Sequence, residues 1–194
     1  MSYQIFNEAI EYTTSLFKVR RINLAFPDGK ARDYHLIDIQ NAVTILPVDD
    51  EGIVHFVRQY RIGARSELLE LPAGKIETGE DPLVTAQREL REETGFGARN
   101  WDALGGFYMT PGYANEYMHC FLARGLYRDP LTPDVDEFLN LVTIPLQQVF
   151  EMVRAAEIED SKSLAVLMLC HLSLKKLWVH GLLFNSLVSL QTRT

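Results

Sequence analysis

The stretch that decides the fold covers residues 74–96 and reads Gly74-Lys-Ile-Glu-Thr-Gly-Glu-Asp-Pro-Leu-Val-Thr-Ala-Gln-Arg-Glu-Leu-Arg-Glu-Glu-Thr-Gly-Phe96. Its middle part has the features of a helix. Asp81 is a typical N-cap, Pro82 suits the first helical position, and Gly95 can end the helix in a left-handed turn. Apolar residues recur at helical spacing at Leu83, Ala86 and Leu90. The stretch therefore predicts a loop, a helix with one apolar face, and a second loop.

Three glutamates lie close together on this predicted helix. Glu89, Glu92 and Glu93 occupy positions i, i+3 and i+4, so they fall within an arc of roughly 100° on one face. Like charges at this spacing destabilise a helix by roughly a few tenths of a kcal/mol per pair. A hard divalent cation bound between the carboxylates would remove that penalty. The competing interpretation is a solvated, charged surface helix.

The same residues resemble a known family. The pattern Gly74-x5-Glu80-x7-Arg88-Glu89-Leu90-x-Glu92-Glu93-x-Gly95-Phe96 is similar to the Nudix box at every specified position. The resemblance extends over roughly residues 13–170. It implies an α/β fold, the α/β/α sandwich on a mixed sheet that strands interleaved with helices also favour. It further implies hydrolysis of a phosphate anhydride with Mg²⁺, or Mn²⁺, as cofactor.

The resemblance also implies roles for individual residues. Glu89 and Glu93 would be the core metal ligands, Glu92 would hold a further ion or a bridging water, and the carbonyl of Ala73 would be an additional ligand. Arg88 precedes Glu92 by four residues and could orient its carboxylate, which places Arg88 and Glu92 among the expected catalytic residues. Glu80, which precedes the predicted N-cap, is expected to support the loop or the start of the helix rather than to bind metal.

Two stretches upstream of the box resemble the ADP-ribose pyrophosphatase branch of the family. They are Arg58-Gln-Tyr-Arg61 and residues 67–74. The resemblance implies that Arg58 and Arg61 contact phosphate or ribose and that Glu70 lies near the site. Arg61 is the preferred cation because a guanidinium can bind phosphate through two parallel hydrogen bonds. The alternative is a surface arginine paired with some acid.

Downstream of the box, Met109-Thr-Pro-Gly-Tyr-Ala-Asn-Glu116 resembles a signature of enzymes that act on ADP-ribose and related nucleoside diphosphate sugars. A Pro-Gly pair is also simply a turn between two strands, and the two interpretations are compatible. Glu116 is expected to bind sugar or metal. Tyr113 could stack on a nucleobase.

The general base is expected on an acidic loop, as in related enzymes. The loop contains Asp134, Asp136 and Glu137. Glu137 is favoured because its longer side chain reaches further, and the two aspartates remain alternatives. Hydrogen-bond reach to the attacking water would decide between them. A solvated acidic loop without a catalytic role is the competing interpretation.

The chain is expected to have two parts. Residues 1–40 would form an N-terminal β-hairpin subdomain with strands over residues 16–24 and 32–39, and residues 41–194 would form the hydrolase domain with C-terminal helices. Further strands are expected at residues 41–48, 53–58, 67–71, 104–109, 117–123 and 138–144, and helices at residues 146–156 and from 161 onward. A hairpin alone is too small to be stable. It must therefore pack on the rest of the chain or on a second subunit. A homodimer with these strands packing across it is expected, as the resemblance also implies.

Composition excludes several classes of partner. The net charge of −7 argues against nucleic acid or an anionic membrane. The two cysteines, Cys120 and Cys170, have no metal-ligand spacing and are expected to be buried, reduced thiols in a cytoplasmic protein. No signal peptide is recognised at the N-terminus. The apolar stretch at residues 164–190 is interrupted by charged and histidine side chains, so it is not expected to span a membrane.

These observations lead to one expected function with two alternatives. The first choice is metal-dependent hydrolysis of ADP-ribose to AMP and ribose 5-phosphate. The second keeps the chemistry but takes GDP-mannose or another nucleoside diphosphate sugar. The third is a non-catalytic nucleotide-sugar sensor on the same fold, which would be expected to lose the box carboxylates that this chain retains.

Overall fold

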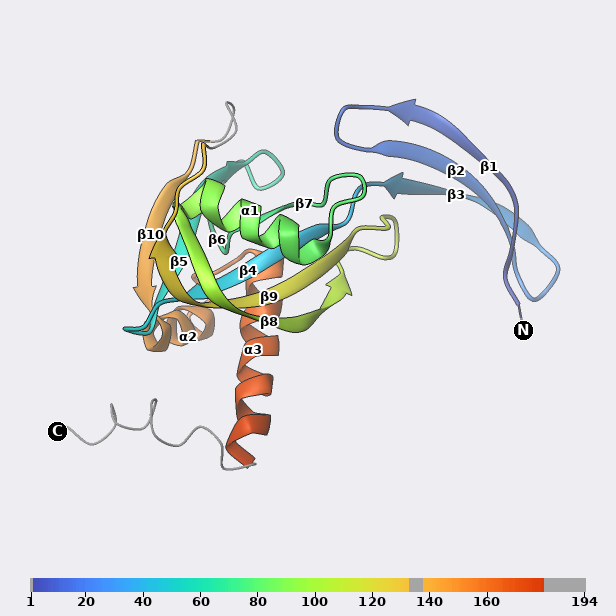
Figure 1. Ribbon diagram of the computed structural model, residues 1–194. Coiled ribbons are helices and arrows are strands. Elements are labelled where there is room, and N and C mark those ends of the chain that lie inside the picture. Colours follow the sequence, from blue (N-terminus) through green and yellow to red (C-terminus); the bar gives the residue numbers. More distant parts are fainter. Residues whose placement is uncertain (1, 133–137, 180–194) are drawn as a thin grey trace.

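The computed structural model describes residues 2–132 and 138–179. A three-stranded sheet lies beside a larger seven-stranded sheet that carries helices on both faces (Figure 1). The strands of the small sheet are β1 (Gln4–Thr13), β2 (Lys18–Ala25) and β3 (Ala31–Asp38). Those of the large sheet are β4 (Ala42–Val48), β5 (Ile53–Arg61), β6 (Ser66–Glu70), β7 (Ala73–Lys75), β8 (Phe96–Tyr108), β9 (Tyr117–Arg128) and β10 (Asn140–Pro145). The helices are α1 (Pro82–Thr94), α2 (Leu146–Arg154) and α3 (Ser161–Val179).

The small sheet contains the predicted hairpin and one strand more. β2 and β3 pair in the expected antiparallel register, and Gly29, at φ 80°, forms the turn between them. The unpredicted strand β1 pairs with β2 along its whole length. Its apolar residues do not alternate strictly with polar ones, and its side chains are exposed at nearly every position, so the sequence lacks the pattern that identifies a half-buried strand. Hydrogen bonds between the backbones of β1 and β2, rather than burial of its side chains, hold this segment in the sheet.

The large sheet is mixed, as predicted. Its order is β10-β5-β4-β9-β8, with β6 beside β5 and β7 beside β4. β4 and β9 run parallel, and the other paired strands run antiparallel. β8 begins at residue 96 rather than near the predicted residue 104. The short strand β7 was not predicted because three residues, Ala73-Gly-Lys75, are too few to show an alternating pattern.

The two faces of β4 explain the layered architecture. Ala42 and Leu46 point to one face and join the core against α2 and α3. Val43 and Ile45 point to the other face and join the core against α1. Because successive side chains of a strand point to opposite faces, one continuously buried strand can serve two cores. The predicted α/β/α sandwich is confirmed.

Helix α1 begins and ends where its sequence predicted. The Asp81 carboxylate accepts a hydrogen bond of 2.8 Å from the Leu83 backbone N–H, and Pro82 is the first helical residue. Gly95 adopts φ 74°, and its N–H donates to the Arg91 carbonyl. These caps determine the length of α1 and thereby which turns face β7.

The two cysteines belong to the hydrophobic core that packs against α2 and α3. Cys120 and Cys170 are buried and form no disulfide. Burial raises the pKa of the Cys120 thiol to about 12 and that of the Cys170 thiol to about 11.

Within residues 2–132 and 138–179, no helix combines the length and the apolar character that a membrane crossing requires.

Replacing Asp81 by Ala should lower the free energy of unfolding by about 1 kcal/mol, because the N-cap hydrogen bond to Leu83 is lost. Urea denaturation followed by circular dichroism measures this change. Asp50→Ala is the control, since Asp50 lies exposed in a turn. An equal effect of the two substitutions would show that the cap does not stabilise α1.

Candidate active site

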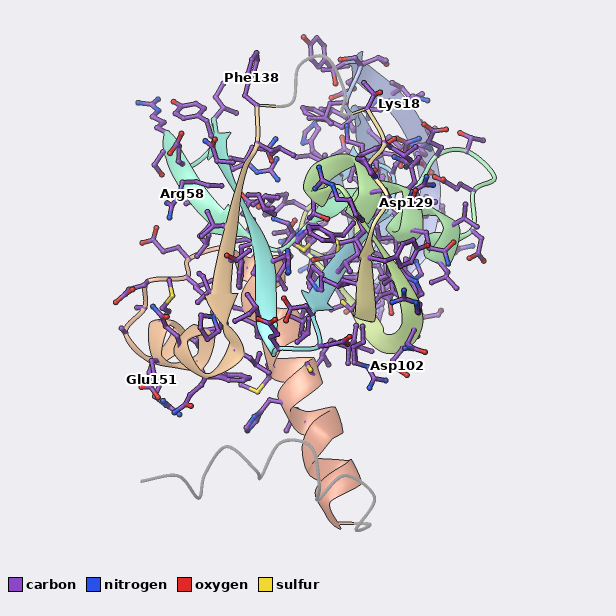
Figure 2. All side chains as sticks on the ribbon, turned by 60° about the vertical axis from the view of Figure 1, so that its left-hand side comes forward. Lys18, Arg58, Asp102, Asp129, Phe138 and Glu151 are labelled. Atoms are coloured by element: carbon purple, nitrogen blue, oxygen red, sulfur yellow. The ribbon has the colours of Figure 1, made fainter. Side chains whose placement is uncertain are left out.

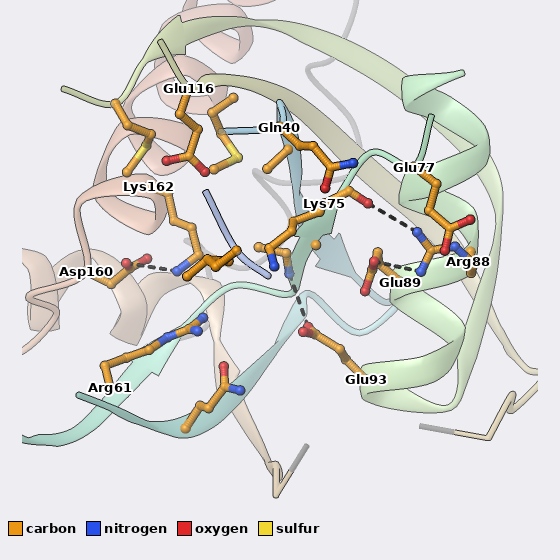
Figure 3. A pocket seen from close by; sticks show the side chains of 17 residues that line it. Gln40, Arg61, Lys75, Glu77, Arg88, Glu89, Glu93, Glu116, Asp160 and Lys162 are labelled. Carbon is orange, nitrogen blue, oxygen red and sulfur yellow. Dashed lines mark hydrogen bonds and ion pairs between the residues drawn. The ribbon is translucent and has the colours of Figure 1, made fainter. Parts of the chain in front are cut away.

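A cavity of about 580 Å³ lies where α1, β7, the end of β5 and the start of α3 meet (Figure 3). Glu89 and Glu93 from α1 line one side of it, and Arg61 and Lys162 line another. Residues far apart in the sequence therefore share one site. The expected acidic helix face does open onto a cavity, and two of its three glutamates line that cavity.

Glu89 and Glu93 are held against the short strand β7. Both residues are largely buried, with 7% and 9% of their surface exposed. Glu93 Oε2 accepts a hydrogen bond of 3.1 Å from the Ala73 N–H. The Glu89 carboxyl lies directly against Gly74, where a Cβ atom would be 1.9 Å from Glu89 Cδ and Oε1. Glycine at residue 74 therefore leaves the Glu89 carboxylate in this position, and any larger residue would displace the carboxylate.

Arg88 links the acids of the box. Its Nη1 donates to Glu89 at 2.7 Å and to Glu92 at 2.8 Å, and the same guanidinium binds Glu80 at 3.2 Å. The hydrogen bond from Arg88 lowers the pKa of the Glu80 carboxyl to about 2. Glu80 also accepts from the Glu77 N–H at 3.2 Å. Glu80 thus supports the loop before α1, in keeping with its expected structural role.

The donor set fits a hard divalent cation. Glu89, Glu93 and Ala73 all line the cavity, and carboxylate and carbonyl oxygens are the ligands that Mg²⁺ and Mn²⁺ prefer. Glu92 is not among the described residues that line it. In the described ranges, no three acidic, histidine or cysteine side chains are already grouped around one point. Of the two carboxylates that line the cavity, Glu89 is bonded to Arg88 and Glu93 to the Ala73 N–H.

The charge of the cavity wall supports the same conclusion. Its described lining contains five acidic and four basic side chains: Glu77, Glu89, Glu93, Glu116 and Asp160, and Arg61, Lys75, Arg88 and Lys162. A wall with this balance does not attract a polyanion. A phosphorylated ligand would need an added cation to bind here.

Arg61 lies at the cavity but is already paired. Its Nε and Nη2 donate to the two oxygens of Glu70 at 2.8 and 2.6 Å. Glu70 is only 1% exposed. Burial is the largest single influence and would raise the Glu70 pKa, but Arg61 and Lys162 together outweigh it, so the pKa is lowered. Arg61 therefore pairs with an acid, as the alternative interpretation expected, and it also lines the cavity. Its contact with phosphate or ribose stays a prediction.

The structure adds a group of residues that the sequence analysis missed. Lys162 Nζ contacts Glu70 Oε2 at 2.5 Å and Asp160 Oδ1 at 2.9 Å. The other Asp160 oxygen accepts from both the N–H and the hydroxyl of Ser163, and the Ser163 Oγ accepts from the Leu71 N–H at 2.8 Å. The spacing Asp-x-x-Ser before a helix is an N-cap signal that could have identified Asp160. No local signal identifies Lys162, because its partner Glu70 is 92 residues away.

Of the three other residues expected to contact the substrate, one lines the cavity and two do not. Glu116 lines the cavity, and burial raises its carboxyl pKa. Arg58 is not among the described lining residues, whereas its neighbours Gln59 and Arg61 are, because alternate side chains of β5 point to opposite faces. Tyr113 is 56% exposed and also does not line the cavity.

The proposed general bases cannot be placed. Glu137, Asp134 and Asp136 all lie outside the described residues. Their roles stay predictions from the sequence.

Comparison with known proteins agrees with this geometry. The NUDIX domain matches residues 38–167. An ADP-ribose pyrophosphatase of Bacillus subtilis is 37% identical over 143 residues, which cover 73% of this chain and 77% of the relative. A methanol dehydrogenase activator of Bacillus methanolicus is 33% identical over 167 residues, which cover 82% and 90%.

A solved structure leads to the same class. The crystal structure of an ADP compounds hydrolase superposes with a TM-score of 0.81 at 28% identity, covering 94% of this chain and 98% of that one. The fold and the carboxylate face against β7 define a hydrolase of phosphate anhydrides. The chain belongs to the Nudix family and is a Nudix hydrolase.

Replacing Gly74 by Ala should displace the Glu89 carboxylate, because the new Cβ would overlap it. We expect Mn²⁺ affinity to fall roughly 10-fold or more, as measured by calorimetry. Gly63→Ala is the matched control, because nothing lies within 4 Å of a Cβ there. Unchanged affinity in the Gly74→Ala variant would contradict the proposed placement of the ion.

Proposed function

We propose that the protein hydrolyses the pyrophosphate bond of a nucleoside diphosphate sugar, with ADP-ribose the first choice and AMP and ribose 5-phosphate the products. The observation that carries this proposal is the convergence of buried Glu89 and Glu93 with Arg61 on one cavity. The names of the Bacillus subtilis relative and of the solved structure support the substrate class.

Mg²⁺, or Mn²⁺ in its place, is the proposed cofactor. Glu89, Glu93 and the carbonyl of Ala73 would hold the ion, and Glu92 would hold a second ion or a bridging water. The bound ion supplies positive charge that polarises the pyrophosphate and compensates the acidic cavity wall. Among these residues, Ala73 already orients Glu93 through its N–H.

Arg88 is proposed to position the carboxylates. It contacts Glu89 and Glu92 through the same nitrogen. Its positive charge reduces the repulsion between carboxylates on successive helical turns. Because Arg88 is also tied to Glu80 and to the Lys75 carbonyl, the acids keep a defined orientation relative to β7.

The proposed substrate contacts divide into two groups. Arg61 would bind a phosphate oxygen from its place at the cavity wall, oriented by Glu70, and Glu116, which also lines the cavity, would contact the substrate. Arg58 and Tyr113 stay proposed contacts for any part of the substrate that extends beyond the cavity.

Glu137 is the proposed base that takes a proton from the attacking water, with Asp134 and Asp136 as alternatives.

The central test is AMP release from ADP-ribose with Mg²⁺, in the wild type and in Glu93→Gln. We expect kcat to fall about 10²-fold or more in the variant, because one oxygen ligand loses its charge. Glu151→Gln serves as control, since Glu151 lies exposed on α2 (Figure 2). Undiminished turnover in Glu93→Gln would contradict the metal role.

The alternatives have separate readouts. Higher kcat/KM for GDP-mannose than for ADP-ribose would favour the second substrate. Saturable ADP-ribose binding without hydrolysis under any divalent ion would favour the sensor.

A homodimer is proposed, with residues 1–40 as the dimerisation subdomain of the hydrolase domain at 41–194. The support is the small sheet, which projects from the body of the molecule in Figure 1. Tyr3, Phe6 and Tyr12 on or beside β1 are 64%, 64% and 62% exposed. Apolar side chains gathered on so small a sheet are typical of a surface that a second copy covers.

A cytoplasmic location is also proposed, supported by the two unpaired, buried cysteines.

Light scattering at micromolar concentration should give twice the chain mass of 22.2 kDa. Phe6→Asp should shift the protein toward the monomer, because a charge would be buried between the subunits. Tyr60→Asp is the matched control, as Tyr60 is 60% exposed on the other sheet. A monomeric wild type would refute the dimer.

A further inference from the structure

The segment between β6 and β7 is held by the first turn of α3. Leu71 and Pro72 lie between the two strands and are buried. A buried backbone N–H requires a hydrogen-bond partner, and the Leu71 N–H donates to the Ser163 hydroxyl oxygen at 2.8 Å. The Pro72 carbonyl accepts from the Ile45 N–H of β4 at 2.9 Å. A side chain of α3 and the backbone of β4 therefore place this segment together.

Asp160 determines the direction of the Ser163 hydroxyl. As the N-cap of α3, its Oδ2 accepts from the Ser163 N–H at 2.9 Å and also from the Ser163 hydroxyl. A hydroxyl carries one hydrogen. Once that hydrogen is donated to Asp160, only the lone pairs of the oxygen remain for Leu71. Ser163 and Leu71 are both 0% exposed and Asp160 is 9% exposed, so this chain of hydrogen bonds is shielded from competing water.

Lys162 makes a second connection between α3 and the same segment. Its Nζ contacts Asp160 at 2.9 Å (Figure 3), and it contacts Glu70 at 2.5 Å. Arg61 is bonded to the same Glu70 carboxylate, so two cations balance two carboxylates. This group therefore contributes a fixed geometry to the cavity wall rather than a net charge.

The other end of the segment reaches the proposed metal ligands. Ala73, the first residue of β7, donates its N–H to Glu93 Oε2 at 3.1 Å, and its carbonyl is itself a proposed ligand. The link from Leu71 to Ala73 is stiff, because Pro72 has a fixed φ and also restricts the backbone of the residue before it. A displacement of Leu71 is therefore passed on to Ala73 rather than absorbed between them.

We propose that Ser163, oriented by Asp160, is a positioning residue for the divalent cation. Through the segment between β6 and β7 it sets the place of the Ala73 carbonyl, and through the Ala73 N–H it sets the orientation of the Glu93 carboxylate. Ser163 is not among the described residues that line the cavity, so it acts through the backbone and does not touch the ion. The proposal rests on the proposed metal ligands and adds the contact that holds them from α3.

Calorimetry with Mn²⁺ tests this role without turnover. Ser163→Ala should weaken Mn²⁺ binding about 10-fold, because loss of a group that orients a metal ligand typically costs roughly 10- to 100-fold in affinity. Ser163→Thr retains the hydroxyl and should bind Mn²⁺ as the wild type does. Cys170→Ala is the control, since it removes a buried side chain further along α3 and leaves the Ser163 contacts in place. Its Mn²⁺ affinity should be unchanged.

A comparison of affinity with folded fraction separates positioning from a general loss of stability. Circular dichroism at the temperature of the titration gives the folded fraction of each variant. Partial unfolding weakens the apparent affinity only in proportion to that fraction. A roughly tenfold weakening in a fully folded Ser163→Ala variant therefore reports displaced ligands.

Pro72→Ala tests the same connection from its other end. It keeps the Ser163 hydroxyl but frees φ at residue 72, so it should also weaken Mn²⁺ binding, and it decides the question if Ser163→Ala does not fold. An unchanged dissociation constant in either folded variant would overturn the positioning role. Absence of Mn²⁺ binding by the wild type would overturn the proposed ligands as well. Mn²⁺ binding without AMP release from ADP-ribose would overturn the proposed activity alone.

Discussion

The site depends on the close approach of the Glu89 carboxyl to the backbone at Gly74. A side chain at residue 74 would overlap Glu89 Cδ, so glycine there allows the carboxyl to keep this position. Together with the hydrogen bond from the Ala73 N–H to Glu93, it holds two turns of α1 against β7. The carboxylates are thereby presented to the cavity rather than to solvent, and every proposed step of the chemistry requires that orientation.

The opposite wall is held by a second set of contacts that reaches the same segment. The Leu71 N–H binds Ser163, and the neighbouring Glu70 binds Arg61 and Lys162. Helix α3 therefore anchors the chain just before the residues that meet α1. Removing one member of such a buried ionic group costs more than the pair contributes, because an unpaired charge remains. The segment between β6 and β7 is thus restrained from both sides, which suits a site that must keep its ligands in place.

Charge is distributed unevenly over the cavity. The acids of α1 form one end, where a divalent cation fits the oxygen donors and would offset the net negative wall. Arg61 offers the guanidinium that suits a phosphate. Lys162 is paired with Glu70 and Asp160, and Glu116 adds a negative charge to the same cavity.

The sequence by itself determined the features that depend on near neighbours. The caps at Asp81 and Gly95 and the shared face of Glu89 and Glu93 follow from spacing along a helix, so they were predictable and are present. Tertiary structure decided what spacing does not encode. It turned Arg58 away from the cavity that Arg61 lines, paired β1 with β2, and brought Lys162 to Glu70 across 92 residues. Such contacts arise from strand register and from which element ends meet, and both are set by packing of the whole chain rather than by local pattern.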